Sequence, residues 1–545
     1  MCDKSDGLRK SSSDIVLGRH METEGKSKKN RTVLMIIAIF CIYMLIQMRY
    51  IGETWFDPDE LDIYGTGFEM FKGKVLYSEI ASQHMPWSYV ISMIFYALGA
   101  HNTVLQRLYF YIMFAAFWTA FIFIYKKHVN KWVLFLQPFA YFAIIQHLDF
   151  GTQILSENIA VIGAQMLLLE FLMFLDKREV SLASCIRISL GVILTFGVSF
   201  VDIYAVFYMV IGVILLEIAW YRNKVKKTKT DNIVKTYTRL VAVVALPWIA
   251  LLIYMLATHS VGAFIKDAYT VNREYYPRYM ANIGAEPMNM FDVGITRIAE
   301  YINQFSFEGF NTLYILKLFI VGCLIFTSYK LVKTKGWIAG ITVFMFVSSL
   351  GIRGLYSFHT VTFIGAATLV TVYAMVTYLY ESKEAFEKKN EGMKFLLVFM
   401  SCLFVASFSE NLHSIFHFIK MEDMNGYKKE CEIVKIITDE DERIWQTNVC
   451  NSVSWGSLRV TKGPTISTPW MWDAVGSEKF EAYKESPARV IIFEDNYESW
   501  GNKMSDYAPE AYTYIKENYT YIPDSNQVWV LNSYYDEACS KLGIN

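Results

Sequence analysis

The sequence predicts a polytopic α-helical membrane protein with about eleven spans and a small C-terminal α/β domain outside the membrane. Three observations support this fold class. Hydrophobic residues make up 54% of the 545 residues and charged residues only 19%, below the share of about 25% that is usual in soluble domains. Apolar runs long enough to cross a bilayer recur up to about residue 411. Residues 412–545 instead alternate short strand-like runs, such as RVIIFED and QVWVLNS, with helical stretches.

The candidate spans follow from the apolar runs, because a helix needs roughly 20 apolar residues to cross a bilayer. They lie at approximately 33–51, 106–125, 132–148, 155–175, 182–199, 202–221, 238–258, 312–330, 337–351, 358–380 and 394–411. Residues 1–30 are polar and end in a basic stretch, with no small-residue cleavage site after the first run. We therefore expect a cytoplasmic tail followed by a signal-anchor helix.

The charge of the loops orients these spans, since Lys and Arg collect on the cytoplasmic side. Every second loop is basic, at 26–31, 126–131, 176–178, 222–235, 329–335 and 383–394. The remaining loops are therefore expected outside. They include 52–105 and 259–311 of the 31–411 membrane module, and the domain at 412–545 lies on the same side. This pattern predicts a multi-pass protein of the plasma (cytoplasmic) membrane with an extracytoplasmic C-terminus.

One apolar segment, PWSYVISMIFYALGA at 86–100, breaks the alternation. It is short for a span, and if it crossed the bilayer every later basic loop would face outside. We therefore expect an interfacial or re-entrant helix on the outer face.

The loop after the first span carries Asp57, Asp59, Glu60 and Asp62 within six positions. A carboxylate there could act as a general base on an acceptor hydroxyl or bind a divalent cation through oxygen. A solvated loop that holds the helix end at the interface is the alternative. The net charge of −1 gives no sign of a nucleic-acid partner. The sequence contains no Walker motif, and the YGTGFEMFKG stretch lacks the third glycine of a dinucleotide fingerprint.

The order of residues after these acids carries a resemblance to a known family. Asp59-Glu60 is followed by Tyr64, Gly73, Tyr77 and His84-Met85-Pro86. This order resembles the first outer loop of polyprenyl-phosphate-sugar glycosyltransferases with the multi-span GT-C fold. It is most similar to the bacterial relatives of the protein O-mannosyltransferases and to the lipid A aminoarabinose transferases, glycosyltransferase families 39 and 83.

Weaker parts of the resemblance lie further along the chain. Glu157, in LSENIAVIGAQMLLL, resembles an acid near the outer end of a family helix. Arg353, Tyr356 and His359 resemble a later Arg-x-x-Tyr-x-x-His turn before a span. The Phe-His order at 358–359 departs from the His-Tyr that relatives often carry, and the proline usual in the following helix is missing. The detailed role of this turn is therefore open.

The resemblance implies an inverting transfer of a sugar from a polyprenyl monophosphate to an acceptor hydroxyl on the outer face. Asp59 would be the base, and Glu60 would orient it or help to hold a cation. Arg353 would bind the phosphate, because guanidinium pairs with phosphate oxygens in bidentate fashion. His84 would contact acceptor or phosphate, with a plain loop histidine as the alternative. Tyr64 and Tyr77 are expected to be packing residues.

The remaining candidate substrate-binding residues are Glu157, Asp202, Tyr356 and His359. Asp202 lies at the outer end of a span, where an ionisable group is a functional hypothesis and a helix cap is the alternative. The NREYYPRYM stretch of the 259–311 loop could close over the donor. The expected partners are the lipid-linked sugar, membrane lipids and a glycan, lipid or protein acceptor, with no nucleic acid. The cofactor is unknown, and Asp59 and Glu60 leave a divalent metal ion possible.

Two other functions remain open from the sequence. A transporter or flippase of lipid-linked sugars would also need many spans, but transporters place polar residues near mid-membrane and often contain repeats. Here the ionisable residues gather on one face instead. The third possibility is a non-catalytic protein that binds glycolipid through its outer domain.

Overall fold

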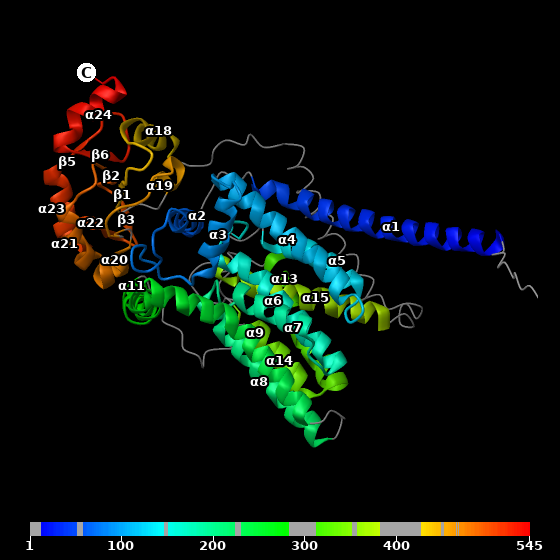
Figure 1. Ribbon diagram of the computed structural model, residues 1–545. Helices are drawn as coiled ribbons and strands as arrows, with labels where there is room; N and C mark the ends of the chain where they lie inside the picture. The colour runs from blue at the N-terminus through cyan, green and yellow to red at the C-terminus, as the bar shows by residue number, and fades with distance from the viewer. Residues whose placement is uncertain are drawn as a thin grey trace, which may run out of the picture.

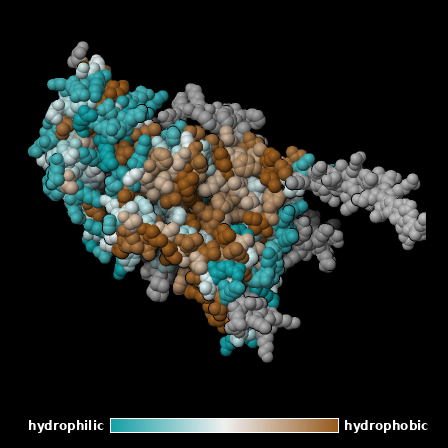
Figure 2. Space-filling model, in the orientation of Figure 1, coloured by the Kyte–Doolittle hydropathy of each residue, from teal (hydrophilic) through white to brown (hydrophobic). Residues whose placement is uncertain are grey.

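A computed structural model describes residues 12–51, 58–145, 151–223, 230–282, 312–350, 357–381, 427–447, 452–464, 466 and 468–544. A bundle of helices forms the larger part of the molecule, and the C-terminal domain lies at one end of it (Figure 1). Hydrophobic side chains gather over the bundle, whereas the C-terminal domain is mostly hydrophilic (Figure 2). The chain is a mostly helical, multi-pass integral membrane protein, as its composition predicted.

Five described helices are long and apolar enough to cross a membrane. They lie in α1 (Ser12–Ile51), α4 (Thr103–Tyr125), α6 (Ser156–Lys177), α8 (Ile203–Arg222) and α9 (Thr230–Ala257). The bundle also contains α5 (Lys131–Ile145), α7 (Leu182–Leu194), α13 (Thr312–Lys335), α14 (Trp337–Ser348) and α15 (Val361–Glu381). Each predicted span overlaps one of these helices except 394–411, which lies outside the described residues. The count of about eleven spans therefore stays a prediction.

Helix α6 lies at the centre of the bundle. In its most apolar stretch of 18 residues 94% is buried, whereas the corresponding share in α9 is 6%. Small residues allow this close packing. A Cβ on Gly365 of α15 would lie 2.4 Å from the Val161 side chain of α6, so this side chain packs directly against the α15 backbone. Gln165 of α6 accepts from the Trp118 indole at 3.0 Å and donates to the Gly365 carbonyl at 2.8 Å. The buried Gln165 side chain thus links α6 to both α4 and α15.

The segment that broke the charge alternation forms α3 (Trp87–Ala97), a helix of 11 residues. At 1.5 Å per residue it is about 16 Å long, which is too short for a hydrocarbon core of about 30 Å. It packs along α2 (Pro58–Phe71), between the bundle and the C-terminal domain (Figure 1). Both helices therefore belong to the layer between the bundle and the C-terminal domain, which we call the outer layer.

The C-terminal domain contains a four-stranded mixed sheet in the order β1-β2-β6-β5. Its strands are β1 (Trp445–Gln446), β2 (Val490–Ile492), β5 (Tyr519–Tyr521) and β6 (Val528–Leu531). β1 pairs parallel to β2 and the other pairs are antiparallel. The period of two in β2 sends Val490 and Ile492 into one core and Ile491 into another. The predicted small α/β domain is present.

Helices cover this sheet: α18 (Lys428–Ile437), α19 (Ser452–Ser457), α20 (Pro469–Met471), α21 (Ser477–Glu485), α22 (Met504–Tyr507), α23 (Pro509–Asn518) and α24 (Tyr535–Leu542). A hairpin of β3 (Glu498–Ser499) and β4 (Asn502–Lys503) stands apart from the main sheet. The described part of the 259–311 loop forms α10 (Val261–Phe264), the π-helix η2 (Ile265–Tyr275) and α11 (Tyr276–Asn282), and its residues 283–311 lie outside the described ranges.

The C-terminal domain is anchored directly to α2. Glu69 and Lys74, both buried, form an ion pair of 2.9 Å. Glu69 also accepts from the backbone N–H of Thr461 at 2.7 Å, and the Lys74 ammonium donates to the Thr461 carbonyl at 3.1 Å. The Trp455 indole donates to Thr103 Oγ1 at 3.1 Å. The outer domain and the acidic helix thus form one packed unit.

Candidate active site

The acidic loop folds into α2, which begins at Pro58 with Asp59 and Glu60 in its first turn. Proline is well suited to the first position of a helix, and carboxylates are stabilised at its positive end. Leu61, Tyr64 and Phe68 are buried at helical spacing. Asp57 lies outside the described residues.

Glu60 is fully buried, and both of its carboxylate oxygens accept hydrogen bonds. Arg107 of α4 donates to it through Nε at 2.8 Å and through Nη2 at 2.5 Å. The Tyr64 hydroxyl and the backbone N–H of Ile154 donate to Oε1 at 2.8 and 3.2 Å. A buried charge is tolerated when it is paired and hydrogen-bonded in this way. Glu60 therefore fixes α2 to the bundle and to the loop before α6.

Asp59 and Asp62 lie three positions apart and so share the other face of α2. Both are half-buried. Tyr89 of α3 donates to Asp62 Oδ2 at 2.6 Å, and the Tyr89 and Ser82 hydroxyls are 2.6 Å apart. Burial raises the pKa of the Asp62 carboxyl, while the nearby His84 lowers it. This face holds two half-buried carboxylates, and burial disfavours the charged form of Asp62.

The turn from Gly73 to Pro86 positions His84. Tyr77 has a positive φ of 72°, rare for a bulky side chain, and its buried hydroxyl donates to the His84 carbonyl at 3.0 Å. The backbone N–H of His84 donates to Ser82 Oγ at 3.1 Å. Tyr77 was expected to be a packing residue, and it is buried, but its hydroxyl also holds the His84 backbone in place.

Asp267 of η2 lies against the same turn and accepts from the backbone N–H of Ser82 at 3.3 Å. Burial raises the pKa of Asp267 from 3.8 to about 6, and the ammonium of Lys479 on α21 opposes this shift. Burial in turn lowers the pKa of Lys479. Its Nζ is buried and has no hydrogen-bond acceptor among the described residues. The π-helix and the C-terminal domain thus bring an acid and a base beside the His84 turn.

The structure places three of the other predicted residues at the outer ends of the bundle helices. Glu157 lies in the first turn of α6, three residues after Ile154, and its carbonyl accepts from Thr362 at 3.1 Å. His359 is buried just before α15, so Glu157 and His359 lie at adjoining helix ends. Asp202 is buried ahead of α8. Arg353 and Tyr356 lie outside the described residues, and their roles stay predictions.

Nine chains of solved structures match this fold, and two of them are crystal structures of ArnT. A crystal structure of ArnT from Cupriavidus metallidurans bound to undecaprenyl phosphate superposes with a TM-score of 0.53 at 9% identity, covering 92% of this chain and 97% of that one. The apo structure of ArnT from that organism gives a TM-score of 0.50 at 9% identity, over 92% and 98% of the two chains. This chain has the ArnT fold. The resemblance stated from the first outer loop is thereby confirmed for the architecture.

The sequence itself gives no comparable match. No protein-family model and no curated protein matches the chain. At 9% identity the ArnT likeness establishes the fold alone, so residue roles rest on the geometry of this chain.

The acids of this ArnT fold do not favour a resident cation at Glu60. A metal ion there would have to displace Arg107, whose positive charge opposes it. No group of three His, Cys, Asp or Glu residues that could hold a metal is found within the described ranges.

Sequence reasoning missed four residues of this site. An arginine inside an apolar run was a usable signal for Arg107, because such residues are expected to be paired or functional. Asp62 was seen in the acidic cluster but not separated from its neighbours. Asp267 and Lys479 gave no local signal, since their pairing joins segments 212 positions apart.

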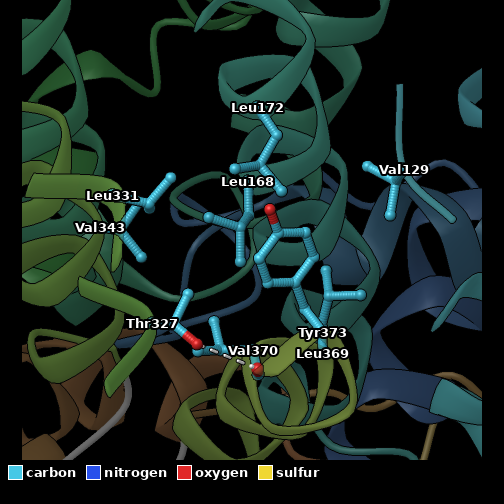
Figure 3. Close-up of a pocket in the computed structure, with 9 residues that line it drawn as sticks. All are labelled: Val129, Leu168, Leu172, Thr327, Leu331, Val343, Leu369, Val370 and Tyr373. Carbon is cyan, nitrogen blue, oxygen red and sulfur yellow. Dashed lines mark hydrogen bonds between the residues drawn. The ribbon is translucent and has the colours of Figure 1, made fainter. Parts of the chain in front are cut away.

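An apolar pocket of about 290 Å³, its open mouth included, lies elsewhere in the ArnT fold (Figure 3). Most of its lining is aliphatic, from α6, α13, α14 and α15, with Thr327 bonded to the Val370 carbonyl at 3.5 Å. Leu172 and Leu331 come from the halves of their helices that the charge pattern assigns to the cytoplasmic side. The pocket therefore belongs to the packing of the bundle.

Proposed function

We propose that this protein is an inverting glycosyltransferase that moves a sugar from a polyprenyl monophosphate to an acceptor hydroxyl on the outer membrane face. The observation that carries the proposal is the division of the acids on α2. Glu60 is locked to Arg107, whereas Asp59 lies half-exposed at the start of the helix. A rigid helix with one accessible carboxylate in its first turn is suited to general base catalysis.

In the proposed reaction Asp59 accepts the proton of the acceptor hydroxyl. The acceptor oxygen then forms a bond to the anomeric carbon from the face opposite the leaving group. The bond between that carbon and the phosphate oxygen breaks, and its electron pair leaves with the polyprenyl phosphate. The phosphate is a good leaving group, so catalysis needs the base and positive charge to stabilise the departing anion.

Positive charge is available on the same side of α2. His84 lies close enough to Asp62 to lower the pKa of its carboxyl. Arg353 stays the predicted phosphate partner, because a guanidinium matches phosphate geometry. Asp62 is held in place by the hydrogen bond from Tyr89.

The donor class is supported by the fold. The ArnT structure of similar fold contains undecaprenyl phosphate, and the long apolar helices of this chain suit a protein that works on a lipid-linked substrate. The clustering of carboxylates and cations between bundle and outer domain supports chemistry at the interface over transport through mid-membrane.

The test incubates the purified full-length protein in lipid nanodiscs with a panel of polyprenyl-phosphate sugars and with glycan, lipid and peptide acceptors. Released polyprenyl phosphate is measured by mass spectrometry. We expect release from at least one donor, and Asp59→Asn should lower the rate by about 10²- to 10⁴-fold. Glu517→Gln, at an exposed carboxylate of α23, is the matched control and should retain the wild-type rate.

Two outcomes would contradict the proposal. Normal release by Asp59→Asn would show that Asp59 is not the base. Donor binding without release under every acceptor condition would favour a non-catalytic lipid-sugar binder, and movement of intact donor between leaflets would favour a flippase.

A further inference from the structure

An aromatic cluster joins three segments of the outer layer beside the His84 turn. Trp470 of α20 lies at its centre and is 2% exposed. The rings of Tyr276 and Tyr279 lie 5.0 and 6.0 Å from its centroid, and that of Trp500 lies 5.4 Å away. Unlike Trp470, these three rings are only half-buried. We call this set, Trp470 with Tyr276, Tyr279 and Trp500, the junction cluster.

Trp500 occupies a conformation that its side chain does not favour. The pairing of Ser499 with Asn502 leaves Trp500 and Gly501 as a two-residue turn, and their φ angles are 53° and 73°. Such turns select Asn, Asp or Gly at both positions, and a bulky residue at positive φ costs about 1–3 kcal/mol. The hairpin thus presents an indole at its tip where glycine or asparagine would relax the backbone.

The junction cluster is hydrogen-bonded to the turn that carries His84. The Trp470 indole donates to Gln83 Oε1 at 2.8 Å, and Asn272 of η2 donates to the Gln83 carbonyl at 2.7 Å. Gln83 precedes His84 in the chain. In Figure 1 the loop that follows α2 runs to α20 and α11, which carry Trp470 and the two tyrosines. A molecule bound at the cluster would lie next to the His84 turn.

We propose that the junction cluster is a carbohydrate subsite that binds a neutral glycan on the acceptor side of the active site. The acceptor role rests on the proposed function; the carbohydrate binding does not. The parts of these rings that stay exposed would take the apolar C–H faces of sugar rings, and nearby polar groups would take the hydroxyls.

The chemistry around the rings favours a carbohydrate over a lipid tail. Asp473 is exposed and accepts a hydrogen bond from Tyr279. Arg278 is exposed and lies over the ring of Tyr275 at 5.3 Å. The hydrophobic belt of Figure 2 lies over the bundle, whereas this domain is hydrophilic. Charged groups at the edges of aromatic faces suit hydroxyl-rich ligands and disfavour hydrocarbon.

The experiment measures binding of soluble glucose and N-acetylglucosamine oligosaccharides, from two to six sugars, to the full-length protein. Lipid nanodiscs are used because sugar-headed detergents would compete. Calorimetry and tryptophan fluorescence report affinity. We expect Trp500→Gly and Tyr276→Ala each to weaken binding by about tenfold or more. Trp337→Ala, at an exposed residue of α14, is the control and should bind as the wild type does.

Trp500→Gly separates binding from structure. Removing the ring also removes the backbone strain, so thermal stability should be equal to or above that of the wild type while binding falls. A loss of stability with unchanged affinity would make Trp500 a packing residue and overturn the subsite. So would the failure of every oligosaccharide to bind, even with polyprenyl phosphate released from donor. Trp500-dependent binding without donor turnover would uphold the subsite and refute the proposed transfer.

Discussion

The two faces of α2 carry acids of the same type in opposite situations. Glu60 accepts hydrogen bonds from three different segments and is closed to solvent. Asp59 and Asp62 face the outer turn, half-buried, and the Asp62 carboxyl has a raised pKa because burial disfavours its charge. One short acidic run thus contains a structural carboxylate and two carboxylates suited to chemistry. The difference arises from helical spacing, which separates Glu60 and Tyr64 from Asp59 and Asp62.

The position of Asp59 on one face of α2 depends on how firmly Glu60 is held on the other face. The ion pair with Arg107 fixes the start of α2, and Asp59 lies in that first turn. A catalytic group must be held within about 0.5 Å of its productive position. Removing the Glu60 carboxylate should therefore mainly lower the stability of the protein. Removing the carboxylate of Asp59 or Asp62 should mainly lower its activity.

The largest effect on stability is expected at the face of α2 that carries Glu60. Arg107→Met leaves the buried Glu60 carboxylate without its cation and should lower the free energy of unfolding by about 3–5 kcal/mol. The double variant Glu60→Gln with Arg107→Met removes both charges and should recover part of this loss. Thermal unfolding in nanodiscs measures both. Arg273→Met, at an exposed arginine, is the control, and a wild-type melting temperature for Arg107→Met would refute the structural role of the pair.

A smaller effect on stability is expected from Asp267, which lies beside the face of α2 that carries Asp59 and Asp62. Its pKa is raised from 3.8 to about 6 in the folded protein. Between these values the folded state binds a proton that the unfolded chain has released, so stability falls as the pH rises from about 4 to 6. The full change is about 3 kcal/mol. Asp267→Asn should flatten this part of the stability curve, measured as melting temperature against pH, and an unchanged slope would count against the shift.

The smallest expected effect concerns Tyr89, whose hydroxyl lowers the pKa of Asp62 by donating to it. Tyr89→Phe removes that bond and should raise the pKa of Asp62 further. If Asp62 must be ionised for transfer, the acidic limb of the kcat/KM profile should move to higher pH. The readout is polyprenyl phosphate release between pH 4 and 9. An unmoved limb would separate Asp62 from the reaction.

Much of the fold was predictable because hydropathy and charge act locally. Each apolar run within the described residues became a helix, and the short segment before Ala97 remained in the outer layer. Two of the four strands of the main sheet, β2 and β6, followed from the strand-like runs at 489–495 and 527–533, whereas β1 and β5 were not predicted. The start of α1 at Ser12 was not predicted, because the polar tail shows no apolar periodicity and simply continues the helix of the first span.

The site was predictable only where neighbours in sequence are neighbours in space. Asp59 and His84 belong to one loop whose residue order could be read directly. Glu60 and Arg107 are 47 positions apart, and burial alone decides that Glu60 is structural. The positive φ of Trp500 could not be anticipated either, since its glycine neighbour signals a turn without saying which residue bears the strain.

The contact between Glu69, Lys74 and Thr461 has a consequence for biosynthesis. The acidic helix is made early, yet the backbone N–H that Glu69 accepts from belongs to a residue 392 positions later. Until Thr461 has been translated, α2 lacks the partner that covers its end. The packed unit of α2 and the C-terminal domain can therefore form only late in synthesis, and the candidate active site is complete only after the last domain has folded.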